Sequence, residues 1–300
     1  MSTFTFKKAT SVALVYNGVA YYLDAMSDYE FSQTFTKSTS SRKTLHNKSS
    51  RPVSKLSGKN SGSASMTVNA SSNKAEQILL YLAGLSAGMS PAEYSLPETL
   101  ATEPEYFDLF VTTPGKLWRL TKCVATGLSF SLYKGSGILL NVDLAFSNLE
   151  TVPGVVDDYA FGAESQDDIL DSTAPLIVHV QEYGDDTELV DIRAANISFQ
   201  QEVSWRQDNT IHSIGQVHVP TRAVLTGMPF NGVLTAYEKS NTELAERLTD
   251  VSIAIQYGWL KIIILNATLA RRMTIEDVFT TQYDITLQDN SSVAVEYGAI

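Results

Sequence analysis

The chain has 300 residues, of which 44% are hydrophobic and 18% are charged, and its formal net charge is −11. This length is typical of two domains of about 100–200 residues each, and no segment reaches the ~18 uninterrupted apolar residues that a membrane helix needs. The N-terminus lacks the apolar core of a signal peptide, so we expect folding in a cytoplasm. A single cysteine, Cys123, excludes an internal disulfide and a cysteine metal cluster, and we expect it in the core.

The charge is divided unevenly along the chain. Residues 1–152 hold 14 Lys and Arg against 11 Asp and Glu, whereas residues 153–300 hold 8 against 22. A segment from Asp157 to Asp191 contains eleven acids and no base. A basic run without any acid contains Lys37, Arg42, Lys43, Lys48, Arg51, Lys55 and Lys59.

The first half reads mainly as strands, because apolar and polar residues alternate between turn signals. Ser11–Tyr16 and Val19–Leu23 flank Asn17-Gly18, a pair typical of hairpin turns. Further strands are expected at Phe31–Phe35, Gly62–Ala70, Tyr106–Thr112, Lys116–Thr121 (after Pro114-Gly115), Cys123–Tyr133 and Ile138–Ser147. Asn73 and Glu76 predict the capped start of a helix with the apolar stripe Ile78, Leu79, Leu82 and Leu85.

The second half gives a similar pattern. Strands are expected at Leu176–Glu182, Glu188–Arg193, Asn196–Trp205, Gly215–Pro220, Ala223–Gly227, Phe230–Glu238, Ser252–Tyr257, Leu260–Leu269, Thr274–Val278 and Tyr283–Leu287. A second helix is predicted from a cap at Ser240 or Asn241 and the stripe Leu244, Leu248 and Val251.

A strand-loop-helix unit occurs twice, about 168 residues apart. Its matching positions are Phe31 and Phe199, His46 and His212, Pro52 and Pro220, Gly58 and Gly227, Gly62 and Gly232, and Asn73 and Asn241. A unit of this length exceeds the ~50 residues of a solenoid repeat and suits two fused copies of a small domain. We predict a mainly β protein of two tandem sandwich or barrel domains, each with one flanking α-helix and a long loop. The domains are expected at residues 1–152 and 175–300, with 153–174 as linker.

No known catalytic or metal-binding motif occurs, and the four histidines are scattered, so no catalytic, cofactor-binding or metal residues are predicted. Carboxylate pairs for glycoside hydrolysis stay open, because they come from distant strands. The basic run could contact phosphates, but Ser38–Ser65 lacks aromatic residues for base stacking, which favours a protein partner. Asp157–Asp191 lacks the spacing of a calcium loop and is read as a solvated or partner-facing surface.

Three stretches carry a family resemblance. Ala195–Gln200 through Val217–Pro220 is similar to a loop-bearing hairpin, Met228–Glu238 to the strand that leads into a helix, and Trp118–Ser147 to a closing strand pair. In this order they resemble the bacteriophage tail tube domain, as found in siphophage tail tube proteins with two tube domains fused in one chain.

The resemblance implies a structural virion protein, the major tail tube protein, and no enzyme. Three chains would form a pseudo-hexameric ring, and rings would stack into a hollow virion tail around a tape-measure protein, with tail terminator and tail-tip proteins as further partners. Double-stranded DNA would pass through without specific binding, no membrane would be involved, and assembly would take place in the host cytoplasm. We expect the basic run to form a ring-stacking interface with the acidic segment Asp157–Asp191 of a neighbouring ring.

Two other functions remain open at this point. A carbohydrate-binding or hydrolysing β-sandwich, such as a phage adhesin, would stay a compact oligomer instead of forming rings. A bacterial secretion-tube subunit would share the fold lineage, but such subunits are usually single-domain hexamer formers, so the internal duplication argues against it.

Overall fold

The computed structural model describes residues 10–25, 29–42, 51–70, 74–86, 92–94, 103–133, 137–162, 175–182, 184–189, 192–206, 217–237, 247–258, 260–275 and 279–297. Over these residues the chain is mainly β, which confirms the predicted fold class. The described part contains one α-helix, α1 (Lys74–Leu82), and the short 3-10 helix η2 (Val156–Asp158). None of its helices is long and apolar enough to span a membrane.

The first half forms a run of antiparallel strands. Its strands are β1 (Ser11–Tyr16), β2 (Val19–Leu23), β3 (Glu30–Ser32), β4 (Phe35–Arg42), β5 (Arg51–Lys59), β6 (Gly62–Asn69), β7 (Leu85–Ser86), β8 (Ala92–Tyr94), β9 (Phe107–Thr113), β10 (Lys116–Tyr133), β11 (Leu139–Phe146), β12 (Asn148–Val152) and β13 (Phe161–Gly162). Seven of them lie side by side in the order β2-β1-β9-β10-β11-β6-β3, and every neighbouring pair is antiparallel.

The second half repeats this order. Its strands are β14 (Leu176–Glu182), β15 (Asp185–Glu188), β16 (Ile192–Gln200), β17 (Glu202–Arg206), β18 (Arg222–Gly227), β19 (Phe230–Tyr237), β20 (Arg247–Tyr257), β21 (Leu260–Ile275) and β22 (Phe279–Tyr297). Their side-by-side order is β15-β14-β20-β21-β22-β19-β16, again antiparallel throughout. Each strand has the same place in both series, so the structure contains two like-folded repeats.

Local irregularities mark the same positions in both repeats. Lys122 in β10 and Asn266 in β21 both have a left-handed backbone, with φ of 50° and 56°, and each sits where the ladder to the preceding strand changes register. The residues that follow them, Cys123 and Ala267, are both fully buried. A left-handed non-glycine residue is uncommon, so its recurrence at matching positions supports the repeat independently of strand order.

The spacing of the repeats changes along the chain. β6 and β19 start 168 residues apart, whereas β10 and β21 start 144 residues apart. The difference arises because the first repeat contains additional chain between α1 and β9, which includes β7 and β8. A comparison of the sequence with itself at one fixed offset therefore loses the match beyond α1.

A strand ladder joins the two repeats into one sheet. The second part of β10, Gly127–Tyr133, pairs with β11 on one side and with residues 194–200 of β16 on the other. In addition, β8 of the first repeat pairs with β22 of the second. Apolar residues from both repeats then form a common core, which includes Phe130 and Ile197 on the joining strands.

The predicted domain boundaries at 152 and 175 stay predictions, but part of the predicted linker is packed on the first repeat. Val156 and Ala160 are buried in a small cluster with Ala13, Ala20 and Phe110. β13 continues this segment and pairs in parallel with β2. Residues 163–174 lie outside the described residues.

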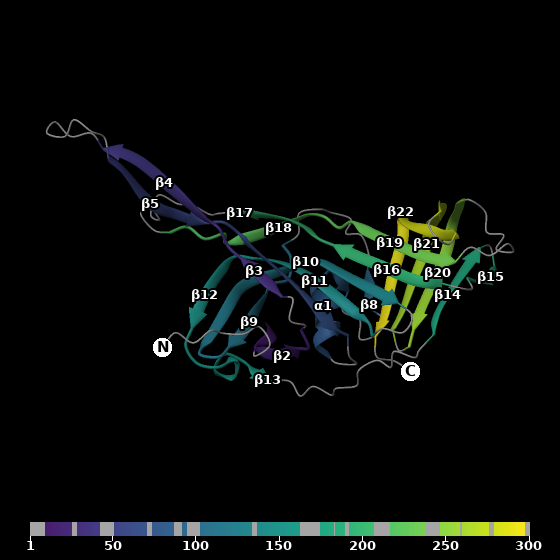
Figure 1. The fold of residues 1–300 in the computed structure, drawn as a ribbon, viewed down its shortest axis with the longest axis horizontal. Helices are drawn as coiled ribbons and strands as arrows, with labels where there is room; N and C mark the ends of the chain where they lie inside the picture. The colour runs from purple at the N-terminus through teal and green to yellow at the C-terminus, as the bar shows by residue number, and fades with distance from the viewer. Residues whose placement is uncertain are drawn as a thin grey trace.

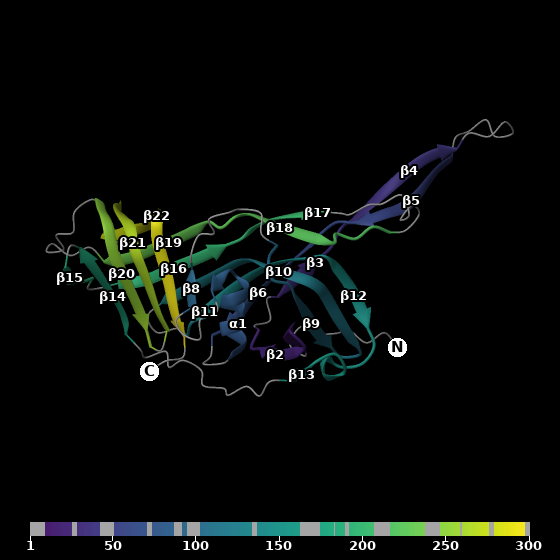
Figure 2. The same ribbon diagram turned by 180° about the vertical axis from the view of Figure 1, so that it is seen from behind.

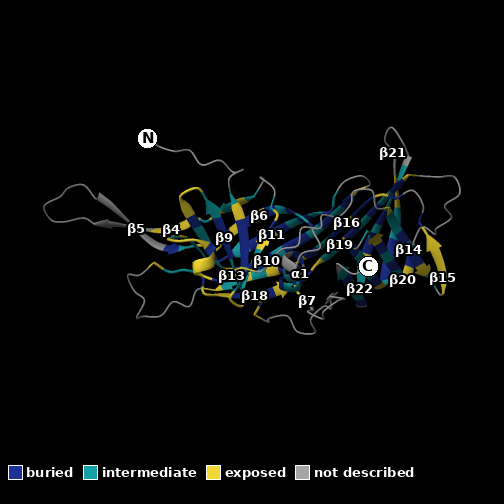
Figure 3. Cartoon of the chain, turned by 90° about the horizontal axis from the view of Figure 1, so that it is seen from below, coloured by how far each residue is buried: buried dark blue, intermediate teal, exposed yellow. Residues whose placement is uncertain are grey.

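The arms of the two repeats lie differently (Figures 1 and 2). The hairpin β4–β5 projects away from the body, on the side opposite the second repeat. The hairpin β17–β18 of the second repeat reaches back along the first repeat. Figure 3 shows that buried positions follow the strands of both repeats, while β13 and β15 are largely exposed.

Several local predictions are confirmed. The turns at Asn17-Gly18 and Pro114-Gly115 connect β1 to β2 and β9 to β10, and α1 begins where a capped helix was expected, with Leu79 and Leu82 buried. Cys123 lies in the core, where its Sγ contacts the Leu120 carbonyl oxygen at 3.3 Å.

Several predictions are wrong. The strand predicted at Gly215–Pro220 is not found in residues 217–220, the part of it that the structure describes, where His218 makes only an isolated bridge. Leu248 and Val251 do not belong to a second helix: they lie in β20, and a bulge with Asp250 at φ 58° turns both toward the core despite their helical spacing. The predicted cap and first turn at 240–246 lie outside the described residues. The basic run is not simply a loop, because β4 and β5 form a paired hairpin. The strand predicted at Glu188–Arg193 is in fact the end of β15 and the start of β16.

Packing at the start of β6 gives a testable expectation. A methyl group on Gly62 would lie 2.1 Å from the Phe146 ring, which is completely buried. Gly62→Ala should therefore lower the free energy of unfolding by about 1–3 kcal/mol through overpacking. Gly137→Ala, which meets no atom within 4 Å, is the control and should leave the denaturation midpoint close to that of the parent. Equal midpoints for both variants in urea would contradict this packing.

Candidate functional site

The joined sheet has one face toward the core and one polar face. In the strands β3, β6, β11, β10, β16, β19 and β22, side chains that alternate with the buried ones point away from the core. Most of these outward positions carry small uncharged polar residues: Ser32, Ser63, Ser65, Thr67, Ser129, Ser131, Asn141, Asn196, Ser198, Asn231, Thr235 and Gln282. We call this surface the polar face. It crosses the joint between the repeats without interruption, because Ser129 lies opposite Ser198 and Ser131 opposite Asn196.

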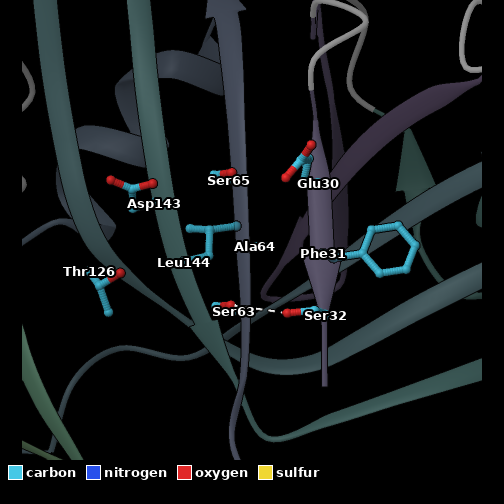
Figure 4. Close-up of a pocket in the computed structure, with 9 residues that line it drawn as sticks. All are labelled: Glu30, Phe31, Ser32, Ser63, Ala64, Ser65, Thr126, Asp143 and Leu144. Atoms are coloured by element: carbon cyan, nitrogen blue, oxygen red, sulfur yellow. Dashed lines mark hydrogen bonds between the residues drawn. The ribbon is translucent and has the colours of Figure 1, made fainter. Parts of the chain in front are cut away.

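Side chains of the polar face bond to one another across the strands. Thr67 Oγ1 donates to Asn141 Oδ1 at 3.0 Å, and Asn141 Nδ2 donates to Ser129 Oγ at 3.5 Å. At the β3 edge of the sheet, the Ser32 and Ser63 hydroxyls lie 3.4 Å apart. These hydroxyls line a shallow pocket of about 440 Å³ between β3, β6 and β11, in which Asp143 and Glu30 are the acidic groups (Figure 4).

Charged groups are few on the polar face among the described residues. Glu30, Asp143 and Asp284 lie within it. Arg272 of β21 reaches it through a hydrogen bond from its guanidinium to Gln282 Oε1 at 2.7 Å, and Arg193 lies beside it with its guanidinium 5.9 Å from the ring of Tyr237. Phosphate binding requires clustered Lys and Arg. The polar face therefore offers a nucleic acid many weak hydrogen-bonding groups but no concentrated positive charge.

The second repeat also holds the first through the root of its arm. Tyr106 accepts a hydrogen bond from the Ala223 N–H at 2.8 Å, and Lys122 Nζ donates to the Thr221 carbonyl at 2.8 Å. The Ser147 hydroxyl donates to the Pro220 carbonyl. Burial raises the pKa of Tyr106, which keeps its hydroxyl protonated. The residues just before and at the start of β18 thus lie against Tyr106, Lys122 and Ser147 of the first repeat.

The predicted ring-stacking residues lie along the β4–β5 arm. Arg42 pairs with Arg51 at the outer end of the described ladder between β4 and β5. Lys55 lies opposite Ser38 in this ladder, and Lys37 lies opposite Leu56. Lys59 belongs to the root of the arm instead, because its Nζ donates to Asn148 Oδ1 at 2.5 Å. Lys43 and Lys48 lie outside the described residues. The structure thus spreads the basic run along an extended arm, and its role in stacking stays a prediction.

The acidic segment is divided between the two repeats. Asp157 and Asp158 belong to η2 on the first repeat, where Asp157 Oδ1 accepts from the Tyr22 hydroxyl at 2.9 Å. Asp185, Asp186 and Glu188 form the exposed strand β15 at the far edge of the second repeat. Glu182, at the end of the neighbouring strand β14, pairs with Asp185. The other acids of the segment, between 163 and 174 and at 191, lie outside the described residues. The sequence cluster is therefore not one surface patch among the described residues.

The described residues contain no group of three or more side chains suited to a metal ion. His179 Nδ1 lies 3.3 Å from Asp186 Oδ1 on exposed strands, and His218 interacts through its backbone, which pairs with Gly58. Among the described residues, the candidate functional site is therefore the polar face of the sheet. The sequence did contain its signal: Ser63, Ser65 and Thr67 alternate with buried Ala64, Met66 and Val68.

The described residues thus show two like-folded repeats that share one sheet with a polar face. Comparison with known proteins specifies the class: the chain belongs to the bacteriophage baseplate tube protein family, whose model matches residues 2–300. It is similar to the baseplate tube protein p140 of Escherichia phage T5, with 24% identity over 289 residues that cover 94% of this chain and 93% of p140.

These findings confirm the prediction of a phage tube protein. They point to the baseplate tube and not to the major tail tube. The matching family and relative are both described as baseplate tube proteins. The sequence had suggested the major tail tube protein instead. The alternation and order of the strands are properties of the tube building block, so they could not distinguish these two places in a tail.

Proposed function

We propose that three copies of this chain form a pseudo-six-fold ring in the baseplate part of a phage tail tube, through which double-stranded DNA passes during ejection. The observation that carries the proposal is the pair of repeats with one strand order, joined edge to edge by β10 and β16. Two equivalent units per chain give six units from three chains, and a repeated head-to-tail contact closes into a ring when its rotation fits.

The polar face is the proposed wall of the lumen. Its small hydroxyl and amide groups keep the wall smooth, and their mutual hydrogen bonds leave fewer free donors for phosphates. Because each Lys or Arg contact to a phosphate strengthens binding in a salt-dependent manner, a wall with few cations lets DNA slide. The opposite face of the sheet packs on the core and cannot serve as a lumen wall.

The proposed partners follow from this position. Other copies of the chain complete the ring, and neighbouring tube rings contact its upper and lower surfaces. A tape-measure protein would occupy the lumen before ejection, and tail terminator and tail-tip proteins would belong to the same assembly. We place the mature protein in the virion tail, with assembly in the host cytoplasm.

The basic arm is the proposed contact between rings. β4–β5 projects well beyond the body of the chain (Figure 1), so it can reach a neighbouring ring. Its positive charges would be steered toward acidic surfaces such as β15 or the segment around η2, which raises the encounter rate and fixes register more than it adds affinity.

A second candidate is the major tail tube itself, and the duplicated tube fold favours it as well. The two candidates differ in self-assembly, because a major tube protein polymerises into long tubes on its own. A baseplate ring has different neighbours above and below and should stop at single rings or short stacks.

Concentrated, purified protein should give rings with a central hole and pseudo-six-fold symmetry in negative-stain images. Its mass in mass photometry should be three times the chain mass of 32.8 kDa. Dilution should return the single-chain mass, which serves as the control. A compact oligomer without a central hole at every concentration would contradict the proposed ring and support an adhesin. Long tubes would support the major tail tube.

The lumen assignment can be tested with gold labels. Asn141→Cys places a thiol on the polar face, whereas Val155→Cys places one on an exposed site of the first repeat away from that face. Burial raises the pKa of the native Cys123 thiol well above its usual range, so Cys123 should not react with maleimide-gold. We expect gold in the hole for Asn141→Cys and on the rim for Val155→Cys. Gold on the rim for Asn141→Cys would show that another face lines the lumen.

Charge reversal tests the arm. Lys43→Glu, Arg51→Glu and Lys55→Glu together should reduce the stacking of rings while the circular dichroism spectrum and melting temperature stay close to the parent values. The cause is lost electrostatic steering, so high salt should weaken stacking of the parent in the same direction. The control, Lys8→Glu, Lys74→Glu and Lys134→Glu, changes the net charge equally outside the basic run. Stacking that falls equally in both variants would leave the arm without a special role.

A further inference from the structure

We propose that the outer surface of the first repeat is the docking site of a second virion protein, which sits on the outside of the tube. The site is formed by residues 153–162, which pack over β1, β2 and β9. The partner that fits it presents an apolar pocket bordered by Lys or Arg side chains. The inference rests on the proposed ring and goes beyond it, because it concerns the exterior and not the lumen.

Residues 153–162 lie on the side of the first repeat opposite the polar face. One layer of this repeat contains β1, β2, β9 and the start of β10, and the other contains β3, β6, β11 and the end of β10. Leu14 and Val142 point inward from the two layers into the main core. Ala13 and Phe110 point the other way from the first layer, into a small separate cluster with Val156. If the polar face lines the lumen, this cluster and the segment over it face the exterior.

Large apolar side chains of the segment point toward solvent. Phe161 is 87% exposed and Val155 is 55% exposed, and β13, which contains Phe161, is an exposed strand in Figure 3. Tyr159 and, from β2, Tyr22 are each more than a third exposed, at 36% and 37%. We call Tyr22, Val155, Tyr159 and Phe161 the outer patch. Large apolar groups that gather on one exposed surface mark an interaction site, whereas single scattered ones are ordinary.

Hydrogen bonds and ring contacts hold the outer patch in place. The Tyr159 hydroxyl donates to the Pro153 carbonyl oxygen at 2.6 Å, and the Tyr159 ring centroid lies 5.2 Å from that of Phe110. The Tyr22 hydroxyl donates to Asp157 Oδ1 at 2.9 Å, and β13 is paired with β2. Side chains that are already ordered lose little entropy on binding, so the outer patch is prepared for a partner.

The second repeat carries a different surface at the matching place. In the first repeat Ala13 lies opposite both Tyr22 and Phe110, and in the second His179 lies opposite both Glu188 and Ala254. Two-residue turns follow both β9 and β20, so Phe110 and Ala254 have the same place in their strands. Among the described residues, the outer patch therefore belongs to the first repeat alone. A ring of three chains would offer three such sites, although its lumen is built from six like units.

The charges around the outer patch are mainly acidic. Asp157 and Asp158 are exposed residues of η2. Arg119 lies 5.9 Å from the ring of Tyr159, but its guanidinium is already bound to Asp108 at 2.6 Å. A partner with Lys or Arg around an apolar pocket complements this surface, because its cations can pair with the carboxylates and lie on the aromatic rings. Aromatic residues also dominate the binding energy of many protein interfaces.

The position of the outer patch favours a different protein over a second copy of this chain. Copies in the proposed ring meet side by side, and stacked rings meet at their upper and lower surfaces, so the exterior is left to other proteins. The alternative occupant is the basic arm β4–β5 of a neighbouring ring, because it also carries cations. A test of the docking site must therefore identify the chain that lies against Phe161.

Photo-cross-linking in assembled virions makes this identification. The photoreactive amino acid p-benzoylphenylalanine takes the place of Phe161 in the full chain during infection. After irradiation, we expect a covalent product of the 32.8 kDa chain with another virion protein. Mass spectrometry should find Lys or Arg beside the apolar attachment point of that protein. The same amino acid in place of Glu188, the counterpart of Tyr22, is the control and should give at most about a tenth of this product.

The outcomes separate this inference from the proposed function. A product with another virion protein at Phe161, and not at Glu188, supports the docking site. A product that contains only two copies of this chain would assign the outer patch to contacts between rings and overturn a separate partner. Equal product at both positions, or none from virions that contain the variant, would also overturn the inference and leave the ring intact. Absence of the parent chain from virions would instead contradict the proposed function.

A charge in the outer patch gives a second measurement. Phe161→Asp should lower the plating efficiency of the phage at least about tenfold, because a buried unpaired charge weakens the contact with the partner. Purified Phe161→Asp should keep the melting temperature and the rings of the parent, since the side chain is exposed. Leu265→Asp is the matched control and should plate normally, because Leu265 is an exposed apolar residue beside His179 and Ala254 on the second repeat. Equal plating of the parent and Phe161→Asp would overturn the docking site.

Discussion

The ladder between β10 and β16 is the contact on which the rest of the structure depends. It turns two sheets into one, aligns the polar residues of both repeats on one face, and brings the core residues Phe130 and Ile197 together. The backbone groups of a strand edge need partners, and here each repeat supplies the other with the missing strand. A tandem duplication of this kind pairs the two edge strands where the repeats meet. Among the described strands, the joined sheet still has an edge strand at each of its two ends.

The left-handed residue at Lys122 explains how one strand can serve two partners. β10 pairs with β9 up to Cys123 and with β16 from Gly127 onward, so the irregularity at Lys122 lies where the strand leaves one neighbour and meets the other. A bulge bends a strand and increases its twist at such a point. β21 has the same irregularity at Asn266, and the described part of its ladder with β20 ends at Ala270.

Sequence reasoning recovered those features that depend on local chemistry. Asn17-Gly18 needs left-handed turn residues, and the alternation of Leu140, Val142 and Leu144 with polar residues follows from a sheet with one core face. The repeat was visible where chain lengths agree, from β3 to β6, and invisible beyond the additional chain around β7 and β8. Leu248 and Val251 were assigned to a helix because a bulge at Asp250 gives a strand the three-residue spacing of a helical stripe. Which edges meet could not be predicted, because pairing between distant strands leaves no local pattern.

The placement of charge follows from the same sheet. The chain is strongly acidic overall, yet the polar face consists mainly of Ser, Thr and Asn, and a set of exposed acids lies on β15 at its far edge. Six repeats around a lumen would repeat any charge on this face six times. The carboxylates of such a dense ring would repel one another as well as DNA, and this repulsion would destabilise the ring. Hydroxyl rows avoid that cost and also avoid phosphate binding. In the proposed ring, acids on the exterior would then serve solubility and the steering of basic arms, while the proposed lumen wall would stay close to neutral.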